Sequence, residues 1–158
     1  GYTMPLPEKD EMYLTKGKML QDIVVCLGGR IAESLVFDDV TTGAVQDIRQ
    51  ATERARDMVT KYGFSDELGM INYSTSDDEV FIGREIGHAK NFSEGTAAVI
   101  DQEVKRIIES CREKATKILK ENRKVLDKLA ELLIEKERIG QQEFEALFEQ
   151  NDETIEEM

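Results

Sequence analysis

The feature that most constrains the fold is a long apolar stripe in the second half of the chain. After Ser93, apolar residues recur at spacings of three and four positions, and they are Ala97, Ile100, Val104, Ile107, Ile108, Cys111, Ala115, Ile118 and Leu119. This spacing predicts one long α-helix that opens at Ser93 and buries one face. Asn122 and Arg123 interrupt the stripe, so we expect a bend or break there.

The same spacing predicts four further helices or helical segments. One covers residues 14–37, where Thr15 is a suitable cap, and another runs from Val45 to Tyr62 and ends at Gly63. Two more follow Arg123. One starts near Val125, and after a turn at Ile139–Gly140 a short helix covers the segment QQEFEALFEQ. Their apolar stripes are Leu20, Ile23, Val24, Leu27, Ile31 and Leu35 in the first; Ile48, Ala51, Thr52, Ala55, Met58, Val59 and Tyr62 in the second; Val125, Leu126, Leu129, Ala130, Leu132 and Leu133 in the third; and Phe144, Leu147 and Phe148 in the last.

Residues 63–92 are the least regular part of the sequence. The segments containing Met70–Tyr73 and Val80–Ile82 are candidates for two short strands of a hairpin. No linker long enough to divide the chain is present. We therefore predict an all-α helical bundle forming a single domain over residues 1–158, with that one hairpin as its only β-structure. The polar end, residues 151–158, is expected to be frayed.

Charge and composition exclude several classes of protein. With 33 acidic and 21 basic residues, the formal net charge is −12, which argues against a duplex nucleic-acid partner that needs a basic patch. No apolar run reaches the roughly 18–20 residues that span a bilayer, and no secretory leader is present. The two cysteines, Cys26 and Cys111, lie in apolar helical stripes and are expected to be buried, reduced thiols; a disulfide is the alternative. The first residue is Gly1, which suggests a piece of a longer protein.

Few residues are candidates for chemistry. The single histidine, His88, lies in an expected loop and is interpreted as solvent-exposed, and one histidine excludes a self-contained site with two histidine ligands. Asp47 follows the TTGA turn and falls in the first turn of a helix, where the dipole favours a carboxylate. Glu33 lies in the apolar first helix, either at the boundary of its buried face or buried with a partner such as Arg30 or Arg54.

Gly28 and Gly29 lie in the middle of the first predicted helix, where each costs about 1 kcal/mol relative to alanine. Close approach of another backbone is the usual reason for keeping such residues. A kink or a functional opening is the alternative.

Several long motifs resemble the peptidase domain of the FtsH family of ATP-dependent zinc metalloproteases. They are LGGRIAESLVF at 27–37, VTTGAVQDIRQATERARDMVTKYGFSDELG at 40–69, FIGREIGHAKNFSEGTAAVIDQEVKRII at 81–108 and ILKENRKVLDKLAELLIEKERIGQQEF at 118–144, preceded by GYTMPLPEKDEMYLTKGKML. The resemblance covers nearly the whole chain in the expected order. It implies the C-terminal part of a peptidase domain that here lacks the HExxH helix.

The resemblance assigns roles to residues of this chain. In the family, the two histidines of HExxH bind Zn²⁺, its glutamate is the general base, and the third ligand is the aspartate of a TTGAxND segment. That aspartate corresponds to Asp47, preceded here by Gln46 where the family usually has asparagine. Glu33 and Arg30, from the GGRxAE motif, become candidates for packing or for support behind the site, and Ser34 replaces the motif's usual second glutamate.

For the intact protein, the resemblance implies an ATP-dependent zinc metalloendopeptidase that degrades unfolded membrane and cytosolic proteins. It implies an ATPase module using ATP and Mg²⁺, a homo-hexamer, and an N-terminal anchor that holds the peptidase on the cytoplasmic side of the membrane. Because one carboxylate does not make a zinc site, residues 1–158 alone are expected to be soluble, to bind no tight zinc and to be inactive. The alternative is a non-catalytic acidic helical module for assembly or interaction.

Overall fold

The computed structural model describes residues 13–37, 39–74 and 92–156, and within them the fold is all-α, as predicted. No strand occurs in this part of the chain. The helices are α1 (Lys16–Val36), the short 3₁₀-helix η1 (Thr42–Ala44), α2 (Val45–Thr60), α3 (Glu94–Glu121), α4 (Arg123–Lys136) and α5 (Gln141–Glu156).

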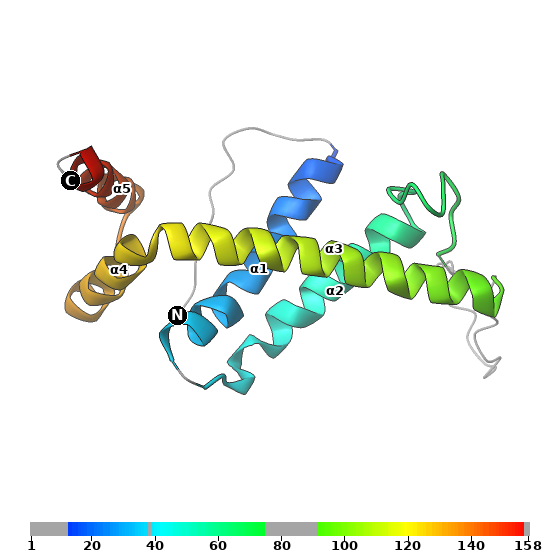
Figure 1. Ribbon diagram of the computed structural model, residues 1–158, viewed down its shortest axis with the longest axis horizontal. Coiled ribbons are helices and arrows are strands. Elements are labelled where there is room, and N and C mark those ends of the chain that lie inside the picture. The colour runs from blue at the N-terminus through cyan, green and yellow to red at the C-terminus, as the bar shows by residue number, and fades with distance from the viewer. Residues whose placement is uncertain (1–12, 38, 75–91, 157–158) are drawn as a thin grey trace, which may run out of the picture.

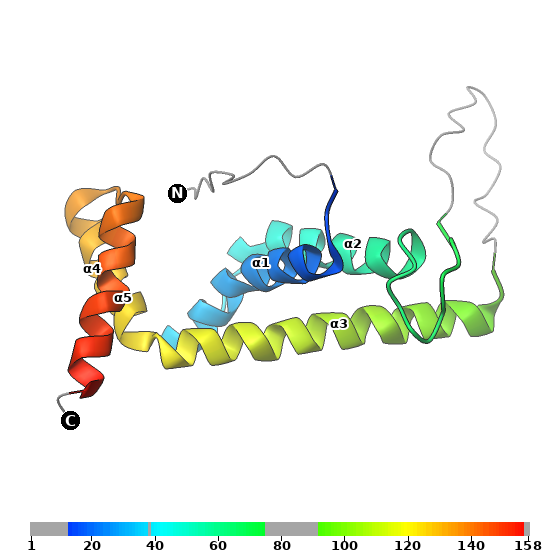
Figure 2. The same ribbon diagram turned by 90° about the horizontal axis from the view of Figure 1, so that it is seen from above.

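The core lies between the first three α-helices. α1 and α2 lie side by side on the same side of the long helix α3, and α1 crosses α3 near its middle (Figures 1 and 2). The buried residues come from the predicted stripes, and those with the largest fully buried side chains are Ile23, Met58, Val59 and Ile100. Burying each such side chain stabilises the fold by roughly 1.5–3 kcal/mol. The packed stripes therefore hold α1, α2 and α3 together, and we call these three helices the body.

α4 and α5 form a helical hairpin at the C-terminal end of α3, away from α1 and α2 (Figure 2). Asn122 ends α3, and its side-chain amide donates a hydrogen bond to the carbonyl oxygen of Ile118, 2.9 Å away. Arg123 then joins the hairpin to the body, because its Nη1 donates to the carbonyl oxygen of Leu35 at the end of α1, also at 2.9 Å. The predicted break at Asn122–Arg123 is confirmed.

Side-chain caps set the starts of α1 and α3. The Thr15 hydroxyl accepts a hydrogen bond from the Lys18 amide at 3.1 Å, and the Ser93 hydroxyl accepts one from the Thr96 amide at 3.2 Å. Each bond satisfies an amide that has no partner inside its helix. Both helices therefore begin where the sequence predicted.

α2 ends at Thr60, two residues before the predicted Tyr62, and the chain then reverses at Gly63. Gly63 has φ +63°, and a Cβ there would lie 3.1 Å from the Cα of Met70, so glycine is required both by its backbone conformation and by space. The returning chain is held by the Tyr73 amide, which donates to the Thr60 carbonyl at 2.7 Å. Met70–Tyr73 forms no strand, while Val80–Ile82, the other half of the proposed hairpin, lies outside the described residues.

A buried carboxylate fixes this loop to α3. Glu103 is 7% exposed and accepts two hydrogen bonds from Arg106, each 2.8 Å long. It also accepts a 2.6 Å hydrogen bond from the Ser65 hydroxyl, whose oxygen accepts one from the Leu68 amide at 3.3 Å. These contacts, led by the Arg106 hydrogen bond, lower the pKa of Glu103 to about 2, so the carboxylate is charged and fully paired at neutral pH.

The remaining expectations on the fold concern the thiols, the membrane and the tail. Cys111 is buried and Cys26 is half-buried, and both are free thiols, as expected. Across the described residues, no helix has the length and apolar character needed to cross a bilayer. α5 continues to Glu156, and fraying of residues 151–158 stays a prediction, as does the single-domain assignment.

Candidate metal centre

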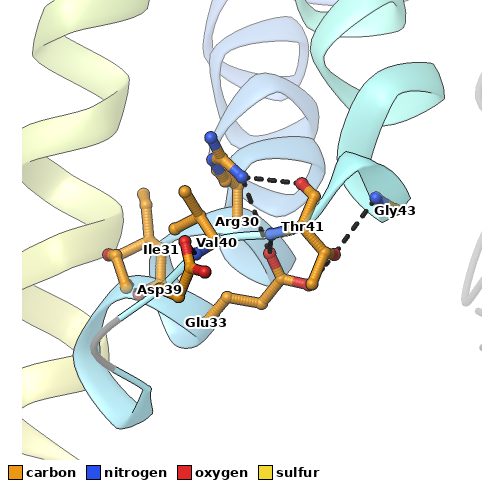
Figure 3. Close-up of polar contacts among 8 residues, drawn as sticks. Arg30, Ile31, Glu33, Asp39, Val40, Thr41 and Gly43 are labelled. Carbon is orange, nitrogen blue, oxygen red and sulfur yellow. Dashed lines mark hydrogen bonds and ion pairs between the residues drawn. The ribbon is translucent and has the colours of Figure 1, made fainter.

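The turn between α1 and α2 is held by two residues of the last turns of α1 (Figure 3). The Glu33 carboxylate accepts hydrogen bonds from both the hydroxyl and the amide of Thr41, at 2.8 and 3.2 Å. The Arg30 Nη1 donates to the carbonyl oxygen of Thr41 at 2.8 Å and lies 3.7 Å from Glu33 Oε2. Three polar groups of one residue are thus fixed to α1, and we call this arrangement the Thr41 clamp.

The Thr41 clamp leads directly into α2. The Thr41 hydroxyl oxygen also accepts a hydrogen bond from the Gly43 amide at 3.2 Å, which caps η1. η1 passes without a gap into α2, since the Val45 amide donates to the Thr42 carbonyl. Ala44 is buried at this junction. The position of the first turn of α2 is therefore set by the contacts of Thr41 with α1.

Asp47 is the third residue of α2 and its only acidic first-turn residue. Its side chain is exposed, and within the described residues no group donates a hydrogen bond to its carboxylate or forms an ion pair with it. The helix dipole favours a negative charge in this first turn. Asp47 is therefore a carboxylate in the first turn of a helix, and no described residue occupies its oxygens.

The Cys26 thiol of α1 is near charged groups of both α1 and α2. Burial raises the pKa of the Cys26 thiol; nearby Arg54 lowers it, and the negative charges of Asp47 and Asp22 raise it again. The nearby cation does not neutralise Asp47, because Arg54 pairs with Asp22 at 2.9 Å. Cys26 is thus near two charges of α2, the Arg54 cation, which pairs with Asp22, and the Asp47 carboxylate.

Glu33 is placed differently from Asp47 and does a different task. Its two oxygens are occupied by Thr41, and these hydrogen bonds, more than the charge of Arg30, lower the pKa of the Glu33 carboxyl. Of the two partners considered for Glu33, the structure shows Arg30, whereas Arg54 is taken by Asp22. Ser34 donates its hydroxyl to the Ile31 carbonyl within its own helix, at 2.8 Å.

The residues present fit one ligand of a zinc site. Zinc in proteins accepts carboxylate oxygens as ligands, and an exposed, unpaired first-turn carboxylate meets that need. Across residues 13–37, 39–74 and 92–156, no group of three or more histidine, cysteine, aspartate or glutamate side chains could hold a metal ion. The remaining ligands would have to come from other segments. His88 lies outside the described residues.

Sequence reasoning missed two polar arrangements. The contacts of Thr41 with Arg30 and Glu33 could not be inferred from sequence spacing. The buried pair of Ser65 and Glu103 was missed altogether, although one signal was present: Glu103 falls within the apolar stripe between Ile100 and Ile107, where a charged residue needs a partner.

Comparison with known proteins agrees with the motifs. Residues 1–147 match the family model described as peptidase family M41. The chain is 51% identical over 152 residues to ATP-dependent zinc metalloprotease FtsH 1 of Thermoanaerobacter sp. (strain X514), a match that covers 96% of this chain and 25% of that protein. It is 52% identical over 147 residues to FtsH of Caldicellulosiruptor bescii, and 43% identical over 155 residues to FtsH of Thermotoga maritima. Those matches cover 93% and 98% of this chain, but 24% and 25% of the relatives. The chain spans about a quarter of the length of these relatives, and it belongs to peptidase family M41.

Proposed function

We propose that this chain is the part of an ATP-dependent zinc metalloendopeptidase that supplies the third zinc ligand, Asp47, and the helical scaffold that positions it. The family match and the relatives named as ATP-dependent zinc metalloproteases support this assignment. The observation that carries it is the exposed Asp47 carboxylate, which has no partner within the described residues and lies in the first turn of a helix fixed by the Thr41 clamp.

Each residue of the site has a separate task in this proposal. Asp47 provides one oxygen ligand, and two histidines of an HExxH segment outside residues 1–158 provide the others. When bound, zinc activates water for attack on a peptide carbonyl. Arg30 and Glu33 do not touch the metal; they hold Thr41, and through η1 they fix the direction in which Asp47 points. Residues 1–158 alone then bind no zinc tightly and cleave no peptide.

The wider assembly is also a proposal. The intact protein would degrade protein substrates with an ATPase module that uses ATP and Mg²⁺, as a homo-hexamer held on the cytoplasmic side of the membrane by an N-terminal anchor. The names of the relatives, which are ATP-dependent zinc metalloproteases, support ATP dependence and zinc. The hexamer and the anchor are supported by the resemblance of the motifs alone.

The test compares two identical substitutions on one helix of the full-length protein. Asp47→Asn replaces the proposed ligand, and Asp57→Asn is its matched control, since Asp57 is an exposed residue of α2 outside the first turn. Casein cleavage and ATP hydrolysis are measured for both. We expect Asp47→Asn to abolish proteolysis and spare ATP hydrolysis, because a neutral amide is a poor zinc ligand, and Asp57→Asn to spare both activities. Proteolysis by Asp47→Asn at the level of the control would refute the assignment.

A further inference from the structure

The last turn of α1 has fewer apolar anchors than the rest of the helix. The buried residues of α1 are Met19, Ile23, Leu27 and Ile31. After Ile31, Leu35 packs against the core but is only half-buried, and Val36 is exposed. This weakly anchored turn carries Glu33, whose carboxylate is part of the Thr41 clamp. The Thr41 clamp therefore depends on whatever else holds the end of α1.

The end of α1 is held by a residue of another helix. The last carbonyl groups of a helix lack partners within it, and their partial negative charge favours a cation. α1 has no basic residue in its last turn. Arg123, the first residue of α4, supplies the missing cation, because its Nη1 donates a 2.9 Å hydrogen bond to the carbonyl oxygen of Leu35. Among the described residues, this is the only hydrogen bond that joins the α4–α5 hairpin to α1 or α2.

The Arg123 guanidinium is itself held in place by its own helix. Its Nε donates to both carboxylate oxygens of Asp127, one turn later, at 2.9 and 3.0 Å. Arg123 also follows directly on the break between α3 and α4, which lies near the end of α1 (Figures 1 and 2). The arginine therefore reaches α1 from a defined position, with Nη1 on the Leu35 carbonyl and Nε on Asp127.

We propose that Arg123 is a positioning residue for the metal ligand Asp47, and that it acts through the last turn of α1 and the Thr41 clamp. Arg123 holds the turn that carries Glu33, Glu33 holds Thr41, and Thr41 leads through η1 into the first turn of α2. Groups that orient a metal ligand without touching the metal affect how tightly the metal binds. The proposal rests on the proposed function, since it takes Asp47 to be a zinc ligand.

Hydrogen exchange in the zinc-free full-length protein tests the first step of this path. Arg123→Gln removes the cation, and Arg112→Gln is the matched control, because Arg112 is a 53% exposed arginine of α3 that pairs with Glu109 of its own helix. We expect the amides of Phe37 and Gly43, which donate to Glu33 and Thr41, to exchange at least about threefold faster in Arg123→Gln than in the control. Equal exchange rates would overturn the proposal.

Zinc affinity of the full-length protein, measured by competition with a chelator, tests the rest of the path. We expect Arg123→Gln to lower the affinity about tenfold and Arg112→Gln to leave it unchanged. Arg123→Lys keeps the charge and a donor for the Leu35 carbonyl, so it should retain more of the affinity than Arg123→Gln. Unchanged affinity in Arg123→Gln, or equal losses in the two Arg123 variants, would overturn the proposal.

A double variant separates positioning from a general loss of stability. Thr41→Val removes the hydroxyl of the Thr41 clamp. If Arg123 acts through that clamp, Arg123→Gln combined with Thr41→Val should lose less affinity than the product of the two separate fold-losses. A loss equal to that product would overturn the proposal. Stoichiometric zinc in Asp47→Asn would instead refute the metal assignment, whereas the exchange rates, measured without zinc, do not depend on that assignment.

Discussion

The Ser65 hydroxyl donates a 2.6 Å hydrogen bond to the carboxylate of Glu103, and both side chains are buried where the loop after α2 meets α3. The two residues are 38 positions apart in the sequence. Glu103 has a second partner in Arg106, but Ser65 is the contact that brings the loop to the helix. The pair therefore joins the α1–α2 half of the body to α3.

Replacing Ser65 should cost stability that an exposed serine does not. Ser65→Ala removes the hydroxyl, leaves one Glu103 oxygen with fewer partners and frees the Leu68 amide, so we expect a loss of about 1 to 3 kcal/mol in the free energy of unfolding. The control is Ser110→Ala on the exposed side of α3, which should change it little. Urea denaturation of both variants measures the difference. Equal effects would mean that the buried hydrogen bond contributes nothing measurable.

The Glu103 carboxyl predicts a specific dependence of stability on pH. Its pKa is lowered from the usual 4.5 to about 2 in the folded chain, first by the Arg106 hydrogen bond. A carboxyl whose pKa is lower in the folded state stabilises that state at pH values above its pKa in the unfolded state. That stability is lost as the pH falls from about 4.5 through about 2. Glu103→Gln should remove this part of the acid destabilisation, whereas Glu109→Gln on the same helix should keep it. This prediction is tested by measuring the slope of the free energy of unfolding against pH for both variants. Identical slopes for the two variants would contradict it.

The Thr41 clamp predicts that a residue that is not itself a metal ligand affects metal binding. In the full-length protein, Thr41→Val keeps the size of the side chain and the amide hydrogen bond to Glu33, but it loses the hydrogen bonds of the hydroxyl with Glu33 and Gly43. We expect zinc affinity to fall about 10- to 100-fold, as is typical for loss of a group that orients a ligand. Thr41→Ser should restore the affinity, and Thr42→Val, at a neighbouring exposed position, should leave it unchanged. Affinity for Thr41→Val equal to that for Thr42→Val would show that the Thr41 clamp does not orient Asp47.

Two glycines of this chain should respond to alanine with opposite signs. In residues 1–158, Gly28→Ala should raise the free energy of unfolding by about 1 kcal/mol, because alanine has a higher helix propensity than glycine. No described atom lies within 4 Å of the new Cβ. Gly63→Ala should lower it, since φ is +63° there and the Cβ would lie 3.1 Å from the Met70 backbone. Thermal or urea denaturation measures both changes. A loss of stability in Gly28→Ala would contradict the open space found around this glycine.

The sequence predicts the helices well because each carries a local, repeating pattern. Capping side chains set the helix starts at Thr15 and Ser93, and an interrupted apolar stripe marks the break at Asn122. Each of these signals depends only on residues that are neighbours in the sequence. Contacts between distant segments were not predictable in this way. The choice of Asp22 over Glu33 as partner of Arg54 depends on how α1 and α2 are rotated against each other, and no spacing within either helix sets that rotation.

The residues of the candidate site likewise differ in whether a local sequence signal could predict them. Asp47 could be singled out because a carboxylate in the first turn after TTGA is a local signal, and the family resemblance gave it a role. Arg30 and Glu33 could be anticipated as supporting residues only from their motif. The residue that they hold, Thr41, contacts them only because the turn folds back onto α1. The expectation that another backbone closely approaches Gly28 and Gly29 was wrong for the described residues, because none of their atoms lies within 4 Å of a Cβ built at either glycine.

The most direct test of the central claim, that Asp47 is the metal ligand supplied by this chain, is the zinc content of the full-length protein. Wild type, Asp47→Asn and Asp57→Asn are dialysed together against the same chelator, and zinc per chain is measured by inductively coupled plasma mass spectrometry. The account predicts stoichiometric zinc in the wild type and in Asp57→Asn and strongly depleted zinc in Asp47→Asn. Stoichiometric zinc in Asp47→Asn would contradict it.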